Sequence, residues 1–356
     1  MNRKDRRRLE KQARTTGRNP PRPGAVPRAP SVSDLLLQHA GQQARPVLDP
    51  AALERIATDA APSPVDMALA EVRRRQLLDR QVEAVEGALQ ANPNDTGLLE
   101  TLAKLHRHRD DRAGALAAYR RILAIDPSRE DVKHMVAALS NVAPAEAPAR
   151  AADAYITSEF DGFAARYDEV LVGALEYRGP DVILQAVQAV LGPNPPPQDV
   201  IDLGCGTGLA GRLLRPLARR LDGVDLSAKM VEQARARGVY DELAVDEIVY
   251  HLLTSGRRYT LAVAADVLIY FGDLEPLMRA LSSVLLPGGL FAFTVEAGEG
   301  APYRLTPSGR YAHDDAYVRA AAAAAGFTVA RATDETVRKE KREPVKSRCY
   351  VLRMLD

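Results

Sequence analysis

The sequence has very few cysteines and no long apolar segment. Its 356 residues include two cysteines, Cys205 and Cys349, which lie far apart and show no metal-ligand spacing. Neither a disulfide framework nor a zinc site is therefore predicted. No apolar run reaches the roughly 18 residues that a membrane span needs, and the basic amino terminus is not followed by the apolar core of a secretory signal. We expect a soluble, cytoplasmic protein that contacts no membrane and binds no metal.

The net charge is close to zero, but it is unevenly distributed. Residues 1–30 hold ten Lys and Arg against Asp5 and Glu10, a balance of +8, while the whole chain has a formal charge of +1. With its five prolines this segment cannot bury enough apolar surface to offset chain entropy, so we predict a disordered basic tail. A solvated tail, contact with nucleic acid or an anionic surface, and an arginine-rich mitochondrial presequence all fit this composition. The tail lacks aromatic side chains for base stacking, which disfavours nucleic acid without excluding it.

A 34-residue period follows the tail. Asn92-Pro93 and Asp126-Pro127 lie 34 positions apart, which is the period of the tetratricopeptide repeat. In the best repeat, 94–127, apolar residues fall where the two helices of such a repeat pack together. They are Leu99, Leu102, Ala103, Ala115, Ala118, Tyr119 and Ile122.

We therefore predict a small all-α, tetratricopeptide-like domain over residues 31–140, followed by a linker rich in Ala and Pro at 141–152. An unrelated helical hairpin is the alternative. Helix pairs of this kind gain stability by stacking, and the array either binds a protein partner or covers a catalytic domain.

From residue 153 onward, strand and helix patterns alternate. Predicted strands lie at 200–203, 220–225, 242–245, 259–265, 290–295, 327–330 and 348–355. This alternation predicts an α/β domain over 153–356 with a doubly wound parallel sheet. Ligands bind beyond the carboxyl ends of the strands in such sheets, so polar residues at those ends are candidates for a binding site.

The most informative segment is a glycine-rich turn after the first of these strands. Gly204, Gly206 and Gly208 follow the strand, and a helix pattern begins directly afterwards. Glycines let a ligand approach the backbone, and the first N–H groups of the helix point at that ligand. A dinucleotide site needs G-x-G-x-x-G, and here the third glycine comes one residue early. The order Asp-x-Gly-x-Gly-x-Gly, which begins at Asp202, instead resembles the first motif of class I S-adenosylmethionine-dependent methyltransferases.

An acidic residue follows at the distance that a nucleoside site requires. Asp225 ends the second predicted strand, 21 residues after Gly204, where a βαβ unit places the acceptor for ribose hydroxyls. A carboxylate accepts from both hydroxyls at once. The alternative is an ordinary strand-to-helix turn with an Asp on the surface. We interpret Cys205 as a small turn residue and not as a nucleophile.

The resemblance extends over both predicted domains. Pro287-Gly288-Gly289 is also typical of class I methyltransferases, and FDGFAARYD (160–168), EYRGP (176–180) and SGRYAH (308–313) resemble a bacterial family of predicted methyltransferases with tetratricopeptide repeats. The resemblance implies S-adenosylmethionine as cofactor and a Rossmann-like seven-stranded sheet whose last strand is antiparallel. The cofactor-binding residues that it implies are Asp202, Gly204, Cys205, Gly206, Gly208, Asp225, Leu226, Asp246, Ala265 and Asp266. Asp246 would accept from the adenine amine, and Glu247 is an equal rival.

Two groups of residues are candidates for the acceptor side. The first comes from an aromatic segment before the central strand, in which Phe160, Phe163, Tyr167 and Leu171 recur at helical spacing. Such a stripe is either core or a flap over the site, and it makes Tyr155, Phe160 and Tyr167 substrate candidates. The second comprises Asp266 and Tyr270, which follow the fourth strand and would face the reacting methyl group.

A glycine-flanked loop after the fifth strand supplies three further candidates. Arg310 could pair with a carboxylate or phosphate of the substrate, and Tyr311 lies beside it. His313 is the candidate general base because its ordinary pKa is near neutrality, or else it merely begins the next helix. Ala265-Asp266-Val267-Leu268 stands where amino methyltransferases of DNA bases have an Asn-Pro-Pro-Tyr run, which disfavours that activity.

The sequence thus predicts methyl transfer from S-adenosylmethionine to a small-molecule or protein acceptor, with the repeats recognising a partner or the substrate. A non-catalytic scaffold that binds S-adenosylmethionine and an RNA methyltransferase that uses the basic tail are the alternatives.

Overall fold

The computed structural model describes residues 64–162, 164, 167–168, 176–340 and 343–356. The predicted basic tail at 1–30, the start of the helical region at 31–63, and Phe163 and Leu171 of the aromatic stripe lie outside the described residues. The chain divides into two compact units, 1–68 and 69–356. Of the first unit, only residues 64–68 are described, and helix α4 begins there.

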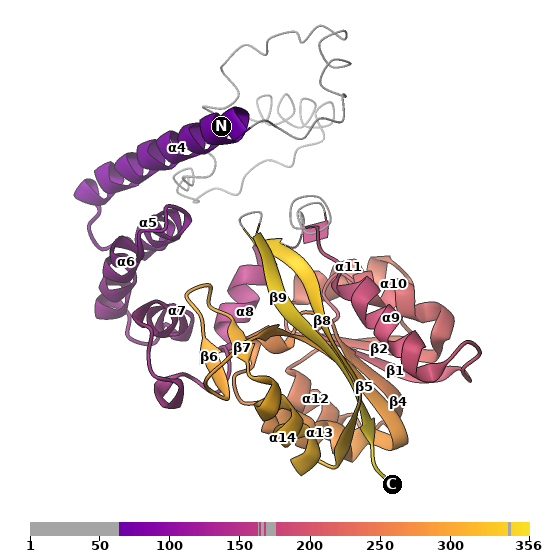
Figure 1. Cartoon of the computed structure of the whole chain (residues 1–356). Coiled ribbons are helices and arrows are strands. Elements are labelled where there is room, and N and C mark those ends of the chain that lie inside the picture. The colour runs from indigo at the N-terminus through magenta and orange to yellow at the C-terminus, as the bar shows by residue number, and fades with distance from the viewer. Residues whose placement is uncertain (1–63, 163, 165–166, 169–175, 341–342) are drawn as a thin grey trace, which may run out of the picture. The chain divides into compact units, whose positions relative to one another are not determined.

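A set of helices, of which α4 is by far the longest, precedes the sheet (Figure 1). They are α4 (Pro64–Ala91), α5 (Thr96–His108), α6 (Arg112–Ile125), α7 (Glu130–Ser140) and α8 (Asp153–Asp161). Helix α5 begins at Asp95, whose side chain accepts from two N–H groups of the first turn, and α6 begins at Asp111 in the same way. The apolar positions predicted to pack the two helices of 94–127 are buried. A helical hairpin therefore stands here, and its assignment to the tetratricopeptide class stays a prediction.

The segment 141–152, predicted as a linker, is held against the sheet domain. It contains a short 3-10 turn, Pro144–Glu146. Ala151 is fully buried, and its N–H donates to the carbonyl of Tyr270 at 2.8 Å. The carbonyl of Ala149 accepts from two N–H groups of the loop that follows Tyr270. The small side chains of this segment thus allow a close approach between two stretches of backbone.

Among the described residues, nine strands form one mostly parallel sheet (Figure 1). Its order is β3-β2-β1-β4-β5-β7-β6, and β9 lies antiparallel between β5 and β8. The strands are β1 (Gln198–Leu203), β2 (Ala218–Asp225), β3 (Glu242–Val245), β4 (Tyr259–Ala264), β5 (Leu285–Ala297), β6 (Tyr303–Leu305), β7 (Tyr311–His313), β8 (Phe327–Glu340) and β9 (Glu343–Met354). The predicted Rossmann-like α/β fold is confirmed.

The predicted number of strands is wrong. The two additional strands are β6 and β7, an antiparallel pair at the carboxyl end of β5, where the sequence interpretation placed a loop. Each is three residues long, which is too short for an alternating pattern to be seen. Strand β8, predicted to end at Ala330, continues to Glu340 through a largely polar stretch.

Helices cover both faces of the sheet. They are α9 (Gly179–Leu191), α10 (Leu209–Leu214), α11 (Ala228–Ala236), α12 (Ile248–Thr254), α13 (Glu275–Val284) and α14 (Asp315–Ala324). Successive side chains of β4 lie on opposite faces of the sheet. Ala262 packs with residues of α12 to α14 on one face, and Val263 packs with residues of α9 and α10 on the other. This burial on two faces explains why β4 is a continuous apolar run. Within the described residues, no helix combines the length and the apolar character needed to cross a membrane.

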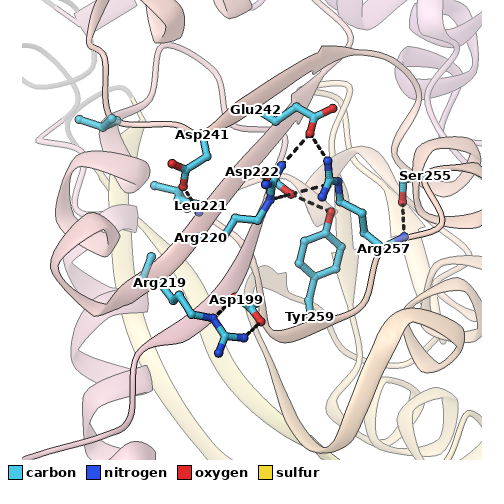
Figure 2. Close-up of polar contacts among 12 residues, drawn as sticks. Asp199, Arg219, Arg220, Leu221, Asp222, Asp241, Glu242, Ser255, Arg257 and Tyr259 are labelled. Carbon is cyan, nitrogen blue, oxygen red and sulfur yellow. Dashed lines mark hydrogen bonds and ion pairs between the residues drawn. The ribbon is translucent and has the colours of Figure 1, made fainter.

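A cluster of charges joins β2, β3 and β4 toward their amino-terminal ends (Figure 2). Asp222 is only 3% exposed, and its carboxylate lies 2.9 Å from Nε of Arg220 and 3.6 Å from Nε of Arg257. The hydroxyl of Tyr259 donates to it at 3.3 Å. Both arginines also contact Glu242 of β3. Because ligands of such sheets bind at the other end, we interpret this cluster as a tie between strands.

Candidate active site

Two adjoining cavities lie at the carboxyl ends of β1, β2 and β4. Both are lined by Gly204, Gly206, Tyr167 and Ala265, so they meet at the glycine-rich turn. The first also contains Phe160, Asp225, Leu226, Glu247, Asp266 and Tyr270. The second also contains Tyr177, Asp202, Cys205 and Thr207. The structure thus brings together most of the residues predicted to bind the cofactor.

The turn itself needs its glycines. Gly204, Gly206 and Gly208 have φ of +65°, +54° and +90°, which disfavours residues with a side chain. A Cβ on Gly204 would come within 2.6 Å of Val267, whereas one on Gly206 would meet no atom of the described residues within 4 Å. Gly206 therefore leaves open space for a ligand. Gly208 lies outside the two cavities, against Tyr240.

Asp225 is oriented by the backbone at the end of β2. Its Oδ2 accepts from the N–H of Gly206 at 2.9 Å, and its Oδ1 accepts from the N–H of Ser227 at 2.8 Å. Burial raises the pKa of this carboxyl. Ser227 also caps α11 by accepting from the N–H of Met230. The carboxylate is thus fixed at the first cavity, where it suits a pair of ribose hydroxyls.

Asp202 has a partner that the sequence did not indicate. It is 1% exposed at the end of β1, and its Oδ2 accepts from the hydroxyl of Tyr240 at 2.7 Å. Burial raises the pKa of Asp202 to about 7. A ligand ammonium in the second cavity would find an acidic group that becomes fully ionised once paired with it.

The adenine end of the site favours Glu247 over Asp246. Glu247 lines the first cavity and Asp246 is not part of its lining. Oε2 of Glu247 accepts from the N–H of Tyr250, whereas its buried Oε1 has no hydrogen-bond partner among the described residues and lies 3.9 Å from Arg150. Asp246 instead accepts from the N–H of Glu247. The open acceptor atom on Glu247 fits an exocyclic amine.

On the acceptor side, Asp266 is held by an arginine that sequence reasoning missed. Asp266 follows β4 with φ of +61°, and its N–H donates to the hydroxyl of Thr294 at 2.9 Å. Its carboxylate pairs with Arg338, which is 3% exposed and also pairs with Glu296 at the end of β5. The polar extension of β8 carries Arg338 to this position, and a charge in a polar stretch gave no signal for it.

Four aromatic side chains border the first cavity: Phe160, Tyr167, Tyr270 and Phe271. The ring of Phe160 lies edge-on to those of Tyr167 and Tyr270, with centroids 6.0 and 5.7 Å apart. Burial raises the pKa of Tyr270. Tyr155 is not part of either lining: it is 5% exposed and packs on the ring of His134 from α7, 4.5 Å away.

Of the other residues predicted to act on the methyl acceptor, His313 and Tyr311 lie in the core and Arg310 lies nearer the surface. His313 does not stand in a loop: it is 2% exposed within β7, between the rings of Tyr303 and Tyr317, and burial lowers its pKa to about 4. Tyr311 is fully buried, and its hydroxyl donates to the carbonyl of Pro148. Neither belongs to the described lining of the two cavities, so His313 is placed as a packing residue and not as a base. Arg310 is half-buried and pairs with Glu340 at 3.3 Å.

Residues 175–329 match the family model of a methyltransferase domain. A ubiquinone biosynthesis O-methyltransferase of Methylobacterium sp. (strain 4-46) is 30% identical over 105 residues, which cover 28% of this chain and 42% of the relative. Methyltransferase-like protein 27 of Homo sapiens is 41% identical over 137 residues, which cover 38% of this chain and 55% of the relative. The chain thus spans about half the length of these curated relatives.

The fold is also similar to solved structures. Magnesium protoporphyrin IX methyltransferase from Synechocystis PCC 6803, with bound SAH, aligns over 57% of this chain and 99% of its own, with 19% identity and a TM-score of 0.44. The predicted enzyme class and cofactor are confirmed at the level of the domain. Residues 175–329 thus form a methyltransferase domain.

Proposed function

We propose that the whole protein transfers a methyl group from S-adenosylmethionine to a small-molecule or protein acceptor, and that the helical repeats take part in recognising the acceptor or a partner. One observation carries the proposal. In the glycine-rich turn, the N–H of Gly206 donates to the carboxylate of Asp225. Both residues line a cavity whose walls come mostly from the methyltransferase domain. The finer resemblance, to methyltransferases that carry tetratricopeptide repeats, remains part of this proposal.

The residues of the two cavities fit the parts of the cofactor. Asp225 would accept from the ribose hydroxyls, Glu247 would accept from the adenine amine, and Asp202 would pair with the ammonium group. Bound there, S-adenosylmethionine supplies an activated methyl group. The protein must then align an acceptor with that group and exclude water, for which Phe160 and Tyr270 provide apolar walls.

A proton acceptor is needed only if the acceptor atom carries a proton. With His313 in the core, Asp266 is the candidate proton acceptor on the acceptor side of the first cavity, whereas Tyr270, whose pKa is raised by burial, stays a phenol that can donate a hydrogen bond. Asp266 is held in place through Arg338, so it can accept a proton or bind a cationic acceptor without rearranging.

Titration with S-adenosylmethionine by calorimetry tests the proposal, followed by a transfer assay with a labelled methyl group. Asp225→Ala removes the ribose acceptor and should weaken binding by about tenfold to a hundredfold, because hydrogen bonds to charged groups contribute roughly 1.5–3 kcal/mol. Asp181→Ala, at an exposed position of α9, is the matched control. Equal affinity in all three proteins would contradict the assigned site. Binding without any production of S-adenosylhomocysteine would favour the non-catalytic scaffold.

A further inference from the structure

A third and larger cavity lies between helices α5 to α7 and the adjoining ends of β8 and β9. It is a groove of about 750 Å3, against about 70 Å3 for the first cofactor cavity, and the two share none of their described lining residues. One wall comes from α5, α6 and the end of α7. The other comes from Pro307 and Ser308 of the β6–β7 turn and from residues 340 and 343–345.

The groove adjoins the acceptor side of the cofactor cavity at two points. Glu159 of the groove directly precedes Phe160 of the cofactor cavity. Glu340 of the groove pairs with Arg310, and the guanidinium of Arg310 lies close enough to Tyr270 to oppose the effect of burial on its pKa. These two links bring residues of the groove beside residues that line the cofactor cavity.

The two walls are tied together by hydrogen bonds. A guanidinium nitrogen of Arg107 in α5 donates to the carbonyl of Ser308 at 3.2 Å. Nε2 of His134 in α7 lies 2.9 Å from the carbonyl of Gly309, and His134 is 2% exposed. These hydrogen bonds hold α5 and α7 against the turn that carries Arg310, so both walls of the groove are fixed in place.

The chemistry of the groove does not suit a flat apolar ring. Its described lining contains no Phe, Tyr or Trp, although rings of that kind bind between aromatic and aliphatic walls. Most of this lining is charged: Lys104, Arg107 and Arg112 stand on the repeat side together with the acidic Asp110, and Glu159, Glu340 and Glu343 lie on or beside the catalytic domain. These opposite signs suit a polar ligand that carries both charges.

The exposure of the groove favours a chain over a small molecule. Several of its charged side chains are exposed, among them Lys104, Glu159 and Glu343. A small-molecule site buries most of its ligand, and an exposed ion pair contributes only about 0.2–1 kcal/mol. Binding here therefore needs many contacts along an extended ligand that continues beyond the groove at both ends.

We propose that this groove binds the methyl acceptor and that the acceptor is a polypeptide segment with charges of both signs. The proposal rests on the proposed function, since it assigns the acceptor of that same reaction. Glu159→Lys and Glu343→Lys reverse charges in the groove, and Glu83→Lys makes the same change at an exposed position of α4 that does not line it.

The test supplies the full chain and labelled S-adenosylmethionine to a lysate of the source organism from which the gene has been deleted. The lysate is separated into protein and small-molecule fractions, and calorimetry measures cofactor binding for every variant. We expect label in the protein fraction, with kcat/KM lower by about tenfold in the two groove variants through KM, and unchanged in Glu83→Lys. Cofactor affinity should be the same in all four proteins.

Different outcomes distinguish a failure of the proposed methyltransferase function from a failure of the proposed acceptor groove. If the wild-type protein binds no S-adenosylmethionine, the proposed function itself fails and the acceptor groove fails with it. If the cofactor binds and label enters only the small-molecule fraction, or neither fraction, the polypeptide acceptor is overturned. If label enters proteins at equal rates in the groove variants and the wild type, the groove is not the acceptor site.

Discussion

Asp202 should make the binding of S-adenosylmethionine depend on pH. Its carboxyl is 1% exposed at the second cavity, and burial raises its pKa to about 7. The cofactor's ammonium group pairs only with the ionised form, so below that pKa a proton must leave before the cofactor binds. The affinity should therefore rise as the pH increases through this range.

The size of the effect follows from the fraction of ionised Asp202. With a pKa of about 7, roughly three quarters of the free protein is ionised at pH 7.5 and roughly one eleventh at pH 6. The apparent affinity should then fall about eightfold between these pH values, or by about 1.2 kcal/mol. The stability of the free protein should change in the opposite direction. A carboxyl whose pKa is higher in the folded state stabilises the fold below its unfolded pKa, and this contribution is lost as pH rises toward 7.

Calorimetry at pH 6 and pH 7.5, in two buffers of different ionisation enthalpy, measures the affinity and the protons released. Close to one proton per cofactor should be released at pH 6 and about a quarter of one at pH 7.5. Asp202→Asn cannot ionise, so its affinity should be lower and insensitive to pH in this range. The burial of Asp225 also raises its pKa, and a slope that survives in Asp202→Asn would assign the proton there. No slope in the wild-type protein would refute the reasoning altogether.

Three further predictions concern single side chains. Glu247→Ala should weaken cofactor binding by about tenfold, measured by calorimetry, whereas Asp246→Ala should have a smaller effect because only Glu247 lines the cavity. Asp222→Ala leaves two guanidinium groups without their shared buried partner. It should therefore lower the free energy of unfolding, measured by urea titration, by about 2–3 kcal/mol and leave cofactor affinity unchanged. His313→Phe should retain methyl transfer, because the side chain at this position only fills space in the core. His313→Ala should lower the melting temperature, because it leaves a cavity beside β7. Loss of activity in a folded His313→Phe protein would restore a catalytic role for His313.

Local spacing was sufficient to predict that the glycine-rich turn and Asp225 lie together. The turn through Gly206 and the acid at Asp225 are separated by one helix and one strand, so their distance in sequence fixes their distance in space. Spacing could not choose between Asp246 and Glu247. They are neighbours at the end of one strand, and only the direction of each side chain, which the helix cap at Glu247 sets, decides which one reaches the cavity.

The acceptor side could not be predicted because it depends on distant parts of the chain. Arg338 and Asp266 are 72 positions apart, and their pairing requires that β8 extend through a polar stretch with no apolar alternation. His313 was misplaced for a related reason. A strand of three residues has no visible period, so the aromatic neighbours that bury His313 could not be foreseen from its own segment.

The extension of β8 joins the reaction centre to the proposed acceptor groove. Near its end β8 is irregular, with a shift of register between Thr336 and Lys339, and its charged side chains pair with different partners. Arg338 holds Asp266, Glu340 pairs with Arg310 at the groove, and Lys339 pairs with Glu176. Burying Arg338 with Asp266 and Glu296 costs solvation free energy, and an apolar cluster of equal volume would stabilise the fold at least as well. In the proposed function these charges serve geometry: one strand positions both the carboxylate that would face the methyl group and the charge at which an acceptor would enter.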